Sequence, residues 1–136
     1  MEHIYSYFKP VISDLYSDKN RWETTQIGRE IDVHIKDVFP DLKFAEIAIF
    51  NVPEYEGSRN SSSEFECKIR DSFYSFHHQN LPRIADLGTI QLMPTRRESF
   101  KIIQIVCEQL LENGTIPVLI GGGHDLTYAV YKAYVS

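Results

Sequence analysis

Cysteine is scarce in this chain, with only Cys67 and Cys107 among its 136 residues. The two lie far apart and lack the Cys-x-x-Cys spacing that is typical of redox and zinc sites. Each falls within a helix-like pattern, where a free cysteine usually behaves as a small buried hydrophobic side chain. We therefore expect neither cysteine to have a redox or metal-binding role.

Long apolar runs and an excess of basic charge are also missing. No run approaches the roughly 18–20 apolar residues of a membrane span. The N-terminus, MEHIYSYFKP, lacks the basic and then apolar plan of a signal peptide. The formal net charge is −5, whereas nucleic acids and membrane surfaces attract basic faces. The composition therefore predicts a cytoplasmic protein that binds neither nucleic acid nor membranes.

What the chain does contain is the material of one globular domain. Hydrophobic residues make up 43% of it and charged residues 24%, as in ordinary soluble domains. A chain of this length can bury about two-thirds of its unfolded surface. We therefore expect a single domain.

Three short apolar segments predict β-strands, at residues 43–52, 83–90 and 116–120. Helical periodicity follows each of them, at residues 64–79, 95–113 and 125–135. One stripe of the first helix is expected to be buried: Phe65, Ile69, Phe73 and Phe76. The second helix begins with the capping-box pair Thr95 and Glu98 and ends before Gly114, a residue suited to a left-handed conformation.

The first forty residues carry a different pattern. Helical spacing predicts an amphipathic helix over residues 24–39, with the apolar positions Ile27, Ile31, Ile35 and Val38. Pro40 ends it. The predicted organisation is thus an N-terminal helical segment, residues 1–42, followed by a βαβαβα core, residues 43–136.

Strands that alternate with helices form right-handed βαβ units and a parallel sheet. In such a sheet, ligands bind in the crevice beyond the carboxyl ends of the strands. The loops at those ends are residues 51–64, 88–94 and 121–125. A functional site is therefore expected among these loops.

The third strand runs directly into Gly121, Gly122, Gly123 and His124. In one interpretation the glycines only allow a tight turn, and the histidine caps or packs. In a second, the turn presents N–H groups to a phosphate, although Leu126 stands where Gly-x-Gly-x-x-Gly requires glycine and no Walker A motif is present. In a third, the imidazole is a metal ligand. Spacing alone leaves all three open.

The segment PVLIGGGHD resembles the first metal-binding motif of the ureohydrolase family, which includes arginase, agmatinase and formimidoylglutamase. Three upstream segments are similar to family elements in the same order. IAIFNVPEYEGSRN resembles the first strand and its loop, ECKIRDSFYSF a helix with an Ile-Arg-x-x-Leu-Tyr run, and IADLGTI the second strand. The helical run is carried by Ile69, Arg70, Phe73 and Tyr74. The resemblance covers about residues 43–134 and is closest to formimidoylglutamase-like bacterial members.

This resemblance implies a three-layer α/β/α parallel sheet of the arginase/deacetylase-like fold, with the first three strands in the spatial order second, first, third. It implies two Mn²⁺ ions that activate water to hydrolyse an amidino, guanidino or formimino C–N bond in a small amino-acid-like substrate. His124 matches a metal ligand of the family, and Arg70 matches an arginine that we expect to be structural.

The family's other metal ligands come from an Asp-x-His-x-x-x-Asp-like segment and an Asp-x-Asp segment, and this sequence contains neither. We therefore expect the chain to be the N-terminal portion of such a protein, inactive by itself, with His124 as its metal ligand and no assigned catalytic residue. Gly123 replaces a common aspartate, and the tail resembles a subgroup with non-catalytic members. The alternative is a non-catalytic relative that acts in binding or assembly.

The remaining polar residues carry weaker predictions. His77 and His78 are adjacent and would point about 100° apart on a helix, so they are not expected to share one ion. His3 and His34 lie outside every motif. Arg59 and Asn60 lie on a loop that is either mobile or gates the substrate. The unpaired apolar edge of residues 116–120 predicts a homo-oligomer.

Overall fold

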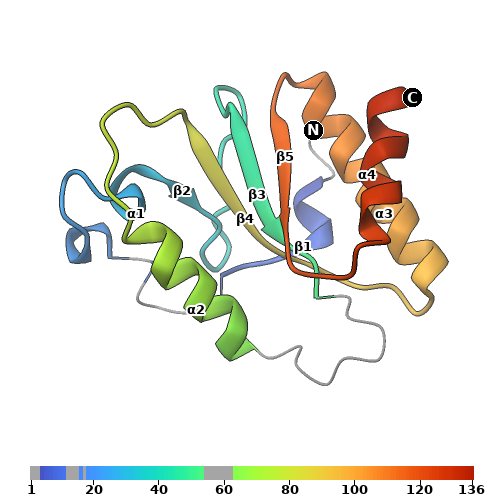
Figure 1. The fold of residues 1–136 in the computed structure, drawn as a ribbon, viewed down its shortest axis with the longest axis horizontal. Helices are drawn as coiled ribbons and strands as arrows, with labels where there is room; N and C mark the ends of the chain where they lie inside the picture. Colours follow the sequence, from blue (N-terminus) through green and yellow to red (C-terminus); the bar gives the residue numbers. More distant parts are fainter. Residues whose placement is uncertain (1–3, 12–15, 17, 54–62) are drawn as a thin grey trace.

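The computed structural model describes residues 4–11, 16, 18–53 and 63–136. At its centre, β3 (Ile47–Asn51) lies between β4 (Ile84–Ile90) and β5 (Ile116–Ile120) (Figure 1). Both neighbours run parallel to β3. The three predicted strands, their direction and their spatial order are therefore confirmed.

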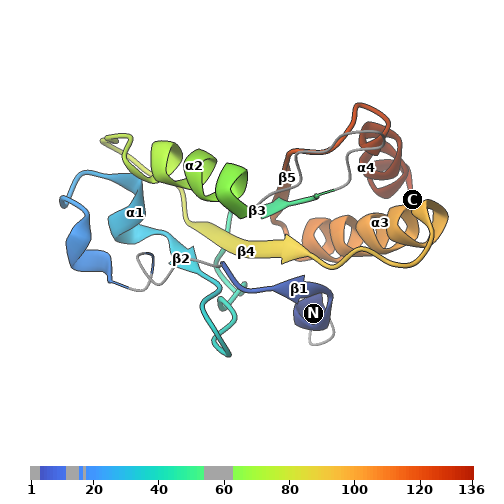
Figure 2. The same ribbon diagram turned by 90° about the horizontal axis from the view of Figure 1, so that it is seen from below.

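Helices pack on both faces of this sheet. α2 (Ser63–Tyr74) covers one face, and α3 (Arg96–Glu112) lies on the other together with α4 (Leu126–Val135) (Figure 2). Alternate residues of a strand point to opposite faces, and accordingly Ile49 packs in a cluster with Tyr74 of α2 whereas Phe50 packs in a cluster with residues of α3. The layered α/β architecture is as predicted. None of the helices in the described residues is both long and apolar enough to cross a membrane.

The ends of α3 follow the predicted capping. The hydroxyl of Thr95 accepts a hydrogen bond from the backbone N–H of Glu98 at 3.2 Å, which satisfies one of the free donors at a helix start. Asn113 caps the other end, and Gly114 follows with φ of +79°. Local sequence signals were sufficient here because both ends depend on neighbouring residues only.

The helix predicted over residues 24–39 is wrong. Within that segment only α1 (Ile27–Glu30) is helical, and β2 (Asp32–Val33) follows it and runs parallel to β4. The described part of the first 42 residues is otherwise built from short elements: η1 (Ile4–Tyr7), β1 (Phe8–Lys9), which is antiparallel to β4, and η3 (Lys19–Arg21). The described part of this segment thus contains only short helical turns and strands, and no long helix.

Two physical causes explain the difference. Isolated helices of this length have little stability, and β-branched residues together with Gly28 lower the helix propensity further. In addition, β4 has an edge that β3 does not cover, and the chain pairs with it: the N–H of His34 donates to the carbonyl of Asp86 at 2.8 Å. Ile31 is nevertheless fully buried, whereas Val38 is 70% exposed.

The buried face of α2 also differs from the predicted stripe. The helix ends at Tyr74, and Phe76 lies beyond it and is 60% exposed. Among the described side chains of α2, those of Arg70 and Tyr74 are buried. A search for apolar residues at helical spacing does not find this buried face, because one of its two residues, Arg70, is charged.

Strand β5 is apolar throughout, a composition that is typical of strands buried on both faces. Among the described residues it pairs with β3 alone and forms an edge of the sheet. Ile116 and Val118 are accordingly 53% and 41% exposed. The burial of an apolar strand depends on what lies beside it, which composition does not reveal.

Cys107 is a buried free thiol, as predicted, whereas the side chain of Cys67 lies outside the described residues. Burial, and secondarily Glu108, raises the pKa of Cys107 from 9.0 to about 12. Between these values the folded state keeps a proton that the unfolded state has lost, so stability is expected to fall as pH rises through this window. We expect iodoacetamide to modify Cys107 only after unfolding. Mass spectrometry of the native protein that detects modified Cys107 would contradict this.

Candidate functional site

The glycine turn lies at the carboxyl end of β5, beside the carboxyl end of β3. In the parallel register Ile120, the last residue of β5, is opposite Asn51, the last residue of β3. Gly121 and Gly122 follow with φ of +84° and +80°. Two successive left-handed residues are unfavourable for any residue with a Cβ atom. The first two glycines are therefore required by the turn itself.

His124 follows on the exposed side of this turn. It lines an open hollow of about 300 Å³ together with the three glycines, Leu119 of β5, and Leu126, Thr127 and Val130 of α4. His124 is exposed, and no hydrogen bond or ion pair of its ring is found among the described residues. The imidazole is thus available to a ligand and does not pack in the hydrophobic interior.

Gly123 and Asp125 flank the histidine. Asp125 forms an ion pair with Arg96 at the start of α3, and both side chains are partly exposed, at 47% and 40%. A Cβ atom added at Gly123 would lie 2.7 Å from Oδ1 of Asp125. An aspartate at position 123 would therefore require Asp125 to move. The turn in this chain is arranged around the smaller residue.

The loop that follows β4 reaches the same edge of the sheet. Ser99 in the first turn of α3 fixes it, because its hydroxyl accepts a hydrogen bond from the N–H of Met93 at 2.8 Å. Leu92 and Met93 are 41% and 42% exposed. The loop after β4 is thus fixed by Ser99 and exposes the apolar side chains of Leu92 and Met93. The loop after β3, with Arg59 and Asn60, lies outside the described residues.

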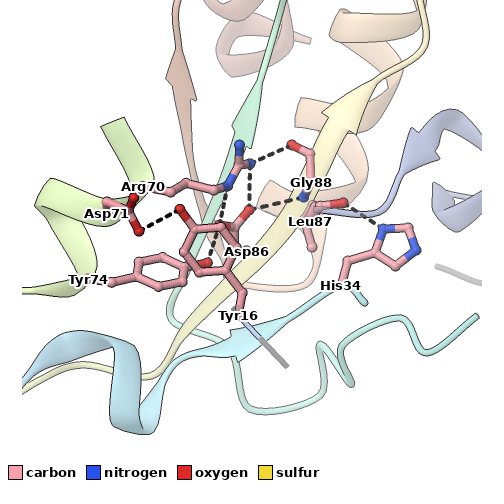
Figure 3. A network of polar contacts seen from close by, with 8 residues as sticks. All are labelled: Tyr16, His34, Arg70, Asp71, Tyr74, Asp86, Leu87 and Gly88. Atoms are coloured by element: carbon pink, nitrogen blue, oxygen red, sulfur yellow. Dashed lines mark hydrogen bonds and ion pairs between the residues drawn. The ribbon is translucent and has the colours of Figure 1, made fainter. Parts of the chain in front are cut away.

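A buried polar network lies on β4 under α2 (Figure 3). Arg70 donates to both carboxylate oxygens of Asp86, from Nε at 2.8 Å and from a terminal nitrogen at 2.9 Å. The Tyr74 hydroxyl donates to the same carboxylate at 2.5 Å, and the N–H of Gly88 does so at 3.0 Å. Arg70 also donates to the carbonyl of Gly88 at 3.1 Å.

This network is structural in character. Arg70 is 3% exposed and Asp86 is fully buried, so the pair is inaccessible to a substrate. Burial first, and the neighbouring Asp86 carboxylate second, raise the pKa of Tyr74 well above its ordinary value, so its hydroxyl stays a donor. These contacts support the expectation that Arg70 is structural. Arg70 joins α2 to β4 through the carboxylate of Asp86 and the carbonyl of Gly88. The partner could have been suspected from the lone acid in the otherwise apolar IADLGTI.

The other histidines lie away from the glycine turn. His34 is buried, with Nδ1 at 2.8 Å from the carbonyl oxygen of Leu87. His77 and His78 lie beyond the end of α2, not within it. The Nδ1 of His77 is 2.7 Å from the Thr25 hydroxyl, and the Nε2 of His78 is 3.6 Å from the Glu30 carboxylate. His3 is outside the described residues.

The described residues do not amount to a dinuclear metal centre. No group of three or more histidine, cysteine, aspartate or glutamate side chains is placed among them to hold an ion. A two-metal centre requires several side chains, mostly carboxylates that bridge the ions. The glycine turn places a single imidazole, that of His124, beside the hollow. Within the described residues, the glycine turn therefore offers one imidazole that could serve as a metal ligand.

The sheet order and the helices on both faces define an α/β protein in which the glycine turn and His124 lie at the carboxyl edge of a parallel sheet. A sequence model of the Arginase family matches residues 47–136. The chain belongs to the Arginase family. A search of curated proteins finds no matching relative.

Solved structures share the fold. Agmatine ureohydrolase of Thermoplasma volcanium aligns with 85% of this chain, with a TM-score of 0.61 and 18% identity. Formiminoglutamase of Trypanosoma cruzi, solved with Mn²⁺, aligns with 72% at a TM-score of 0.56 and 21% identity. Formimidoylglutamase from Bacillus subtilis aligns with 74% at a TM-score of 0.53 and 18% identity. The chain spans about 40% of the length of each.

Proposed function

We propose that this chain provides one metal-binding strand end of a Mn²⁺-dependent hydrolase that cleaves an amidino, guanidino or formimino C–N bond in a small amino-acid-like substrate. The observation that carries the proposal is the placement of His124. It is an exposed imidazole on a glycine turn, at the carboxyl end of a parallel strand, inside the part of the chain that the family model matches.

In this proposal the residues of the chain position one metal ligand and leave room for the metal and the substrate. A neutral imidazole offers a nitrogen to the metal, and the glycines beside it leave room for a metal and a substrate. Bound Mn²⁺ ions would supply Lewis-acid chemistry. The Asp125–Arg96 ion pair ties the start of α4 to the start of α3 and so holds the turn in place.

Among possible substrates we favour a formimino amino acid. The support is the Gly-Gly-Gly-His sequence of the turn, which resembles formimidoylglutamase-like members, and the formiminoglutamase structure that carries Mn²⁺. The agmatine ureohydrolase of similar fold makes a guanidino substrate the second choice. The two classes differ in product, since water converts a formimino group to formamide and a guanidino group to urea.

The test is an assay of the protein expressed from its complete gene, with Mn²⁺ and one substrate of each class. We expect formamide release and a decrease in kcat/KM of about 100-fold or more for His124→Ala, because loss of even an indirect metal partner costs 10- to 100-fold. Bound manganese, measured by atomic absorption, should decrease in parallel. His77→Ala is the matched control, since that histidine is also exposed but lies away from the turn.

Two outcomes would count against the proposal. Full activity of the His124→Ala variant would remove the histidine from the metal site. A folded wild-type protein that is inactive on both substrates in the presence of Mn²⁺ would favour the alternative, a family relative that acts in binding or assembly.

A further inference from the structure

The glycine turn has few contacts of its own to fix the direction of His124. Glycine restricts the backbone less than any other residue, and three glycines precede the histidine. The carbonyl of His124 accepts a hydrogen bond from the N–H of Thr127 at 3.1 Å, and the carbonyl of Gly123 accepts one from Leu126 at 3.2 Å. These bonds join the histidine to the first turn of α4. The direction of the imidazole therefore depends on how the start of α4 is fixed to its neighbours.

Asp125 is at the N-cap position of α4 but does not cap the helix. An aspartate at this position usually accepts a hydrogen bond from a free N–H of the first helical turn, whereas the side chain of Asp125 makes no such bond. Its Oδ2 pairs instead with the guanidinium of Arg96 at the start of α3. The carboxylate thus connects two helices and does not stabilise its own helix end.

Arg96 is itself supported by the hydrophobic core. Its guanidinium lies over the ring of Phe100, one turn further along α3, at 5.1 Å from the ring centre. Phe100 packs against the core cluster to which both α3 and α4 contribute. The ion pair therefore fixes the start of α4 to an arginine whose position depends on the core.

The second carboxylate oxygen of Asp125 lies against Gly123. The atoms nearest to a Cβ atom added at Gly123 are Oδ1 at 2.7 Å and Cγ at 3.8 Å, both of Asp125. Gly121 and Gly122 have positive φ, whereas Gly123 does not, so the backbone conformation at position 123 does not require glycine. The missing side chain at this position instead leaves space that the Asp125 carboxylate occupies.

We propose that Asp125 and Arg96 are positioning residues for His124, and that Gly123 is part of the same arrangement because it admits the carboxylate. The inference rests on the proposed function, in which His124 is a metal ligand. Such a ligand must be held within about 0.5 Å of its productive position, and loss of a partner outside the ligand set lowers metal affinity by about 10- to 100-fold. Asp125 follows His124 in the chain, so release of the start of α4 displaces the imidazole with it.

The first test measures Mn²⁺ binding by isothermal titration calorimetry, with metal-free protein expressed from the complete gene. We expect Arg96→Ala and Asp125→Ala to raise the dissociation constant about 10-fold, the lower end of that range, because the histidine remains. Arg21→Ala is the matched control, since Arg21 is 36% exposed against 40% for Arg96 and also pairs with an aspartate, Asp71. The metal-free variants should unfold at similar temperatures, because an exposed ion pair contributes little to stability.

The outcomes separate this inference from the proposed function. If His124→Ala loses Mn²⁺ while Arg96→Ala or Asp125→Ala binds it as tightly as the wild type, the inference is wrong and the proposed function stands. A wild-type protein that binds no Mn²⁺ would overturn both. Equally weak binding by Arg21→Ala would mean that the effect is not specific to the turn, and would also overturn the inference.

The second test uses Gly123. Gly123→Ala places a Cβ atom against Oδ1 of Asp125, so the end of that side chain has to turn aside. We expect this variant to keep its unfolding temperature and to bind Mn²⁺ about as weakly as Asp125→Ala. In a double variant with Asp125→Ala, Gly123→Ala should cause no further loss. A Gly123→Ala variant that binds as tightly as the wild type, or an effect that adds in full to that of Asp125→Ala, would contradict the proposal.

Discussion

Replacement of Asp86 by alanine is expected to destabilise the chain by about 3–5 kcal/mol, because removal of one partner of a buried ion pair leaves the other charge uncompensated. Arg70 would lose both of its bonds to the carboxylate, and Tyr74 would lose the acceptor of its hydroxyl. Most domains have only about 5–15 kcal/mol of stability. Urea unfolding followed by circular dichroism would measure the loss.

Two further variants make this prediction specific. Asp37→Ala, at an exposed position, should change the stability by less than about 0.5 kcal/mol. The double variant Arg70→Met with Asp86→Leu should recover part of the loss, because it leaves no unpaired charge in the interior. If Asp86→Ala were as stable as Asp37→Ala, the buried network would have little role in stability.

Replacement of Gly88 by alanine should be of similar severity. Gly88 has φ of +92°, and a Cβ atom there would lie 2.1 Å from the carbonyl oxygen of Lys9 in β1. The backbone conformation alone costs about 1–3 kcal/mol for a residue other than glycine. The clash is with backbone, so it can be relieved only by separating β1 from β4.

Gly114→Ala provides the control. Gly114 has a similar φ of +79°, but a Cβ atom there meets nothing within 4 Å. The difference in unfolding free energy between the two variants therefore isolates the contact between β1 and β4. We expect Gly88→Ala to be the less stable of the two in urea, and also to expose the Lys9 amide to hydrogen exchange. Equal stabilities would show that β1 contributes little to the fold.

The elements that the sequence predicts well are those that depend on near neighbours. β3, β4 and β5 are short apolar segments bounded by polar turns, and α3 is defined by Thr95 at one end and Gly114 at the other. The segments that were mispredicted depend on distant partners. β2 forms because β4, some fifty residues later in the chain, has a free edge, and tertiary context of this kind overrides helical spacing.

The candidate site also has parts that the sequence predicts and parts that it does not. The glycine turn and His124 are contiguous, so their position at a strand end follows once the strand is recognised. The Asp125–Arg96 ion pair and the Asp86–Arg70 pair each join residues from two elements. Their geometry arises from the packing of α2 on β4 and of α4 on α3, which periodicity does not specify.

The position of β4 in the sheet has a consequence for the order in which this chain folds. β1, β2 and β3 all precede β4 in the sequence, and all three pair with it. During synthesis from the N-terminus, none of them can complete its pairing until the part of β4 that it contacts has left the ribosome, which for β1 means as far as Ile90. Phe8 and Ile49, both buried in the native protein, would be exposed to chaperones for that whole interval.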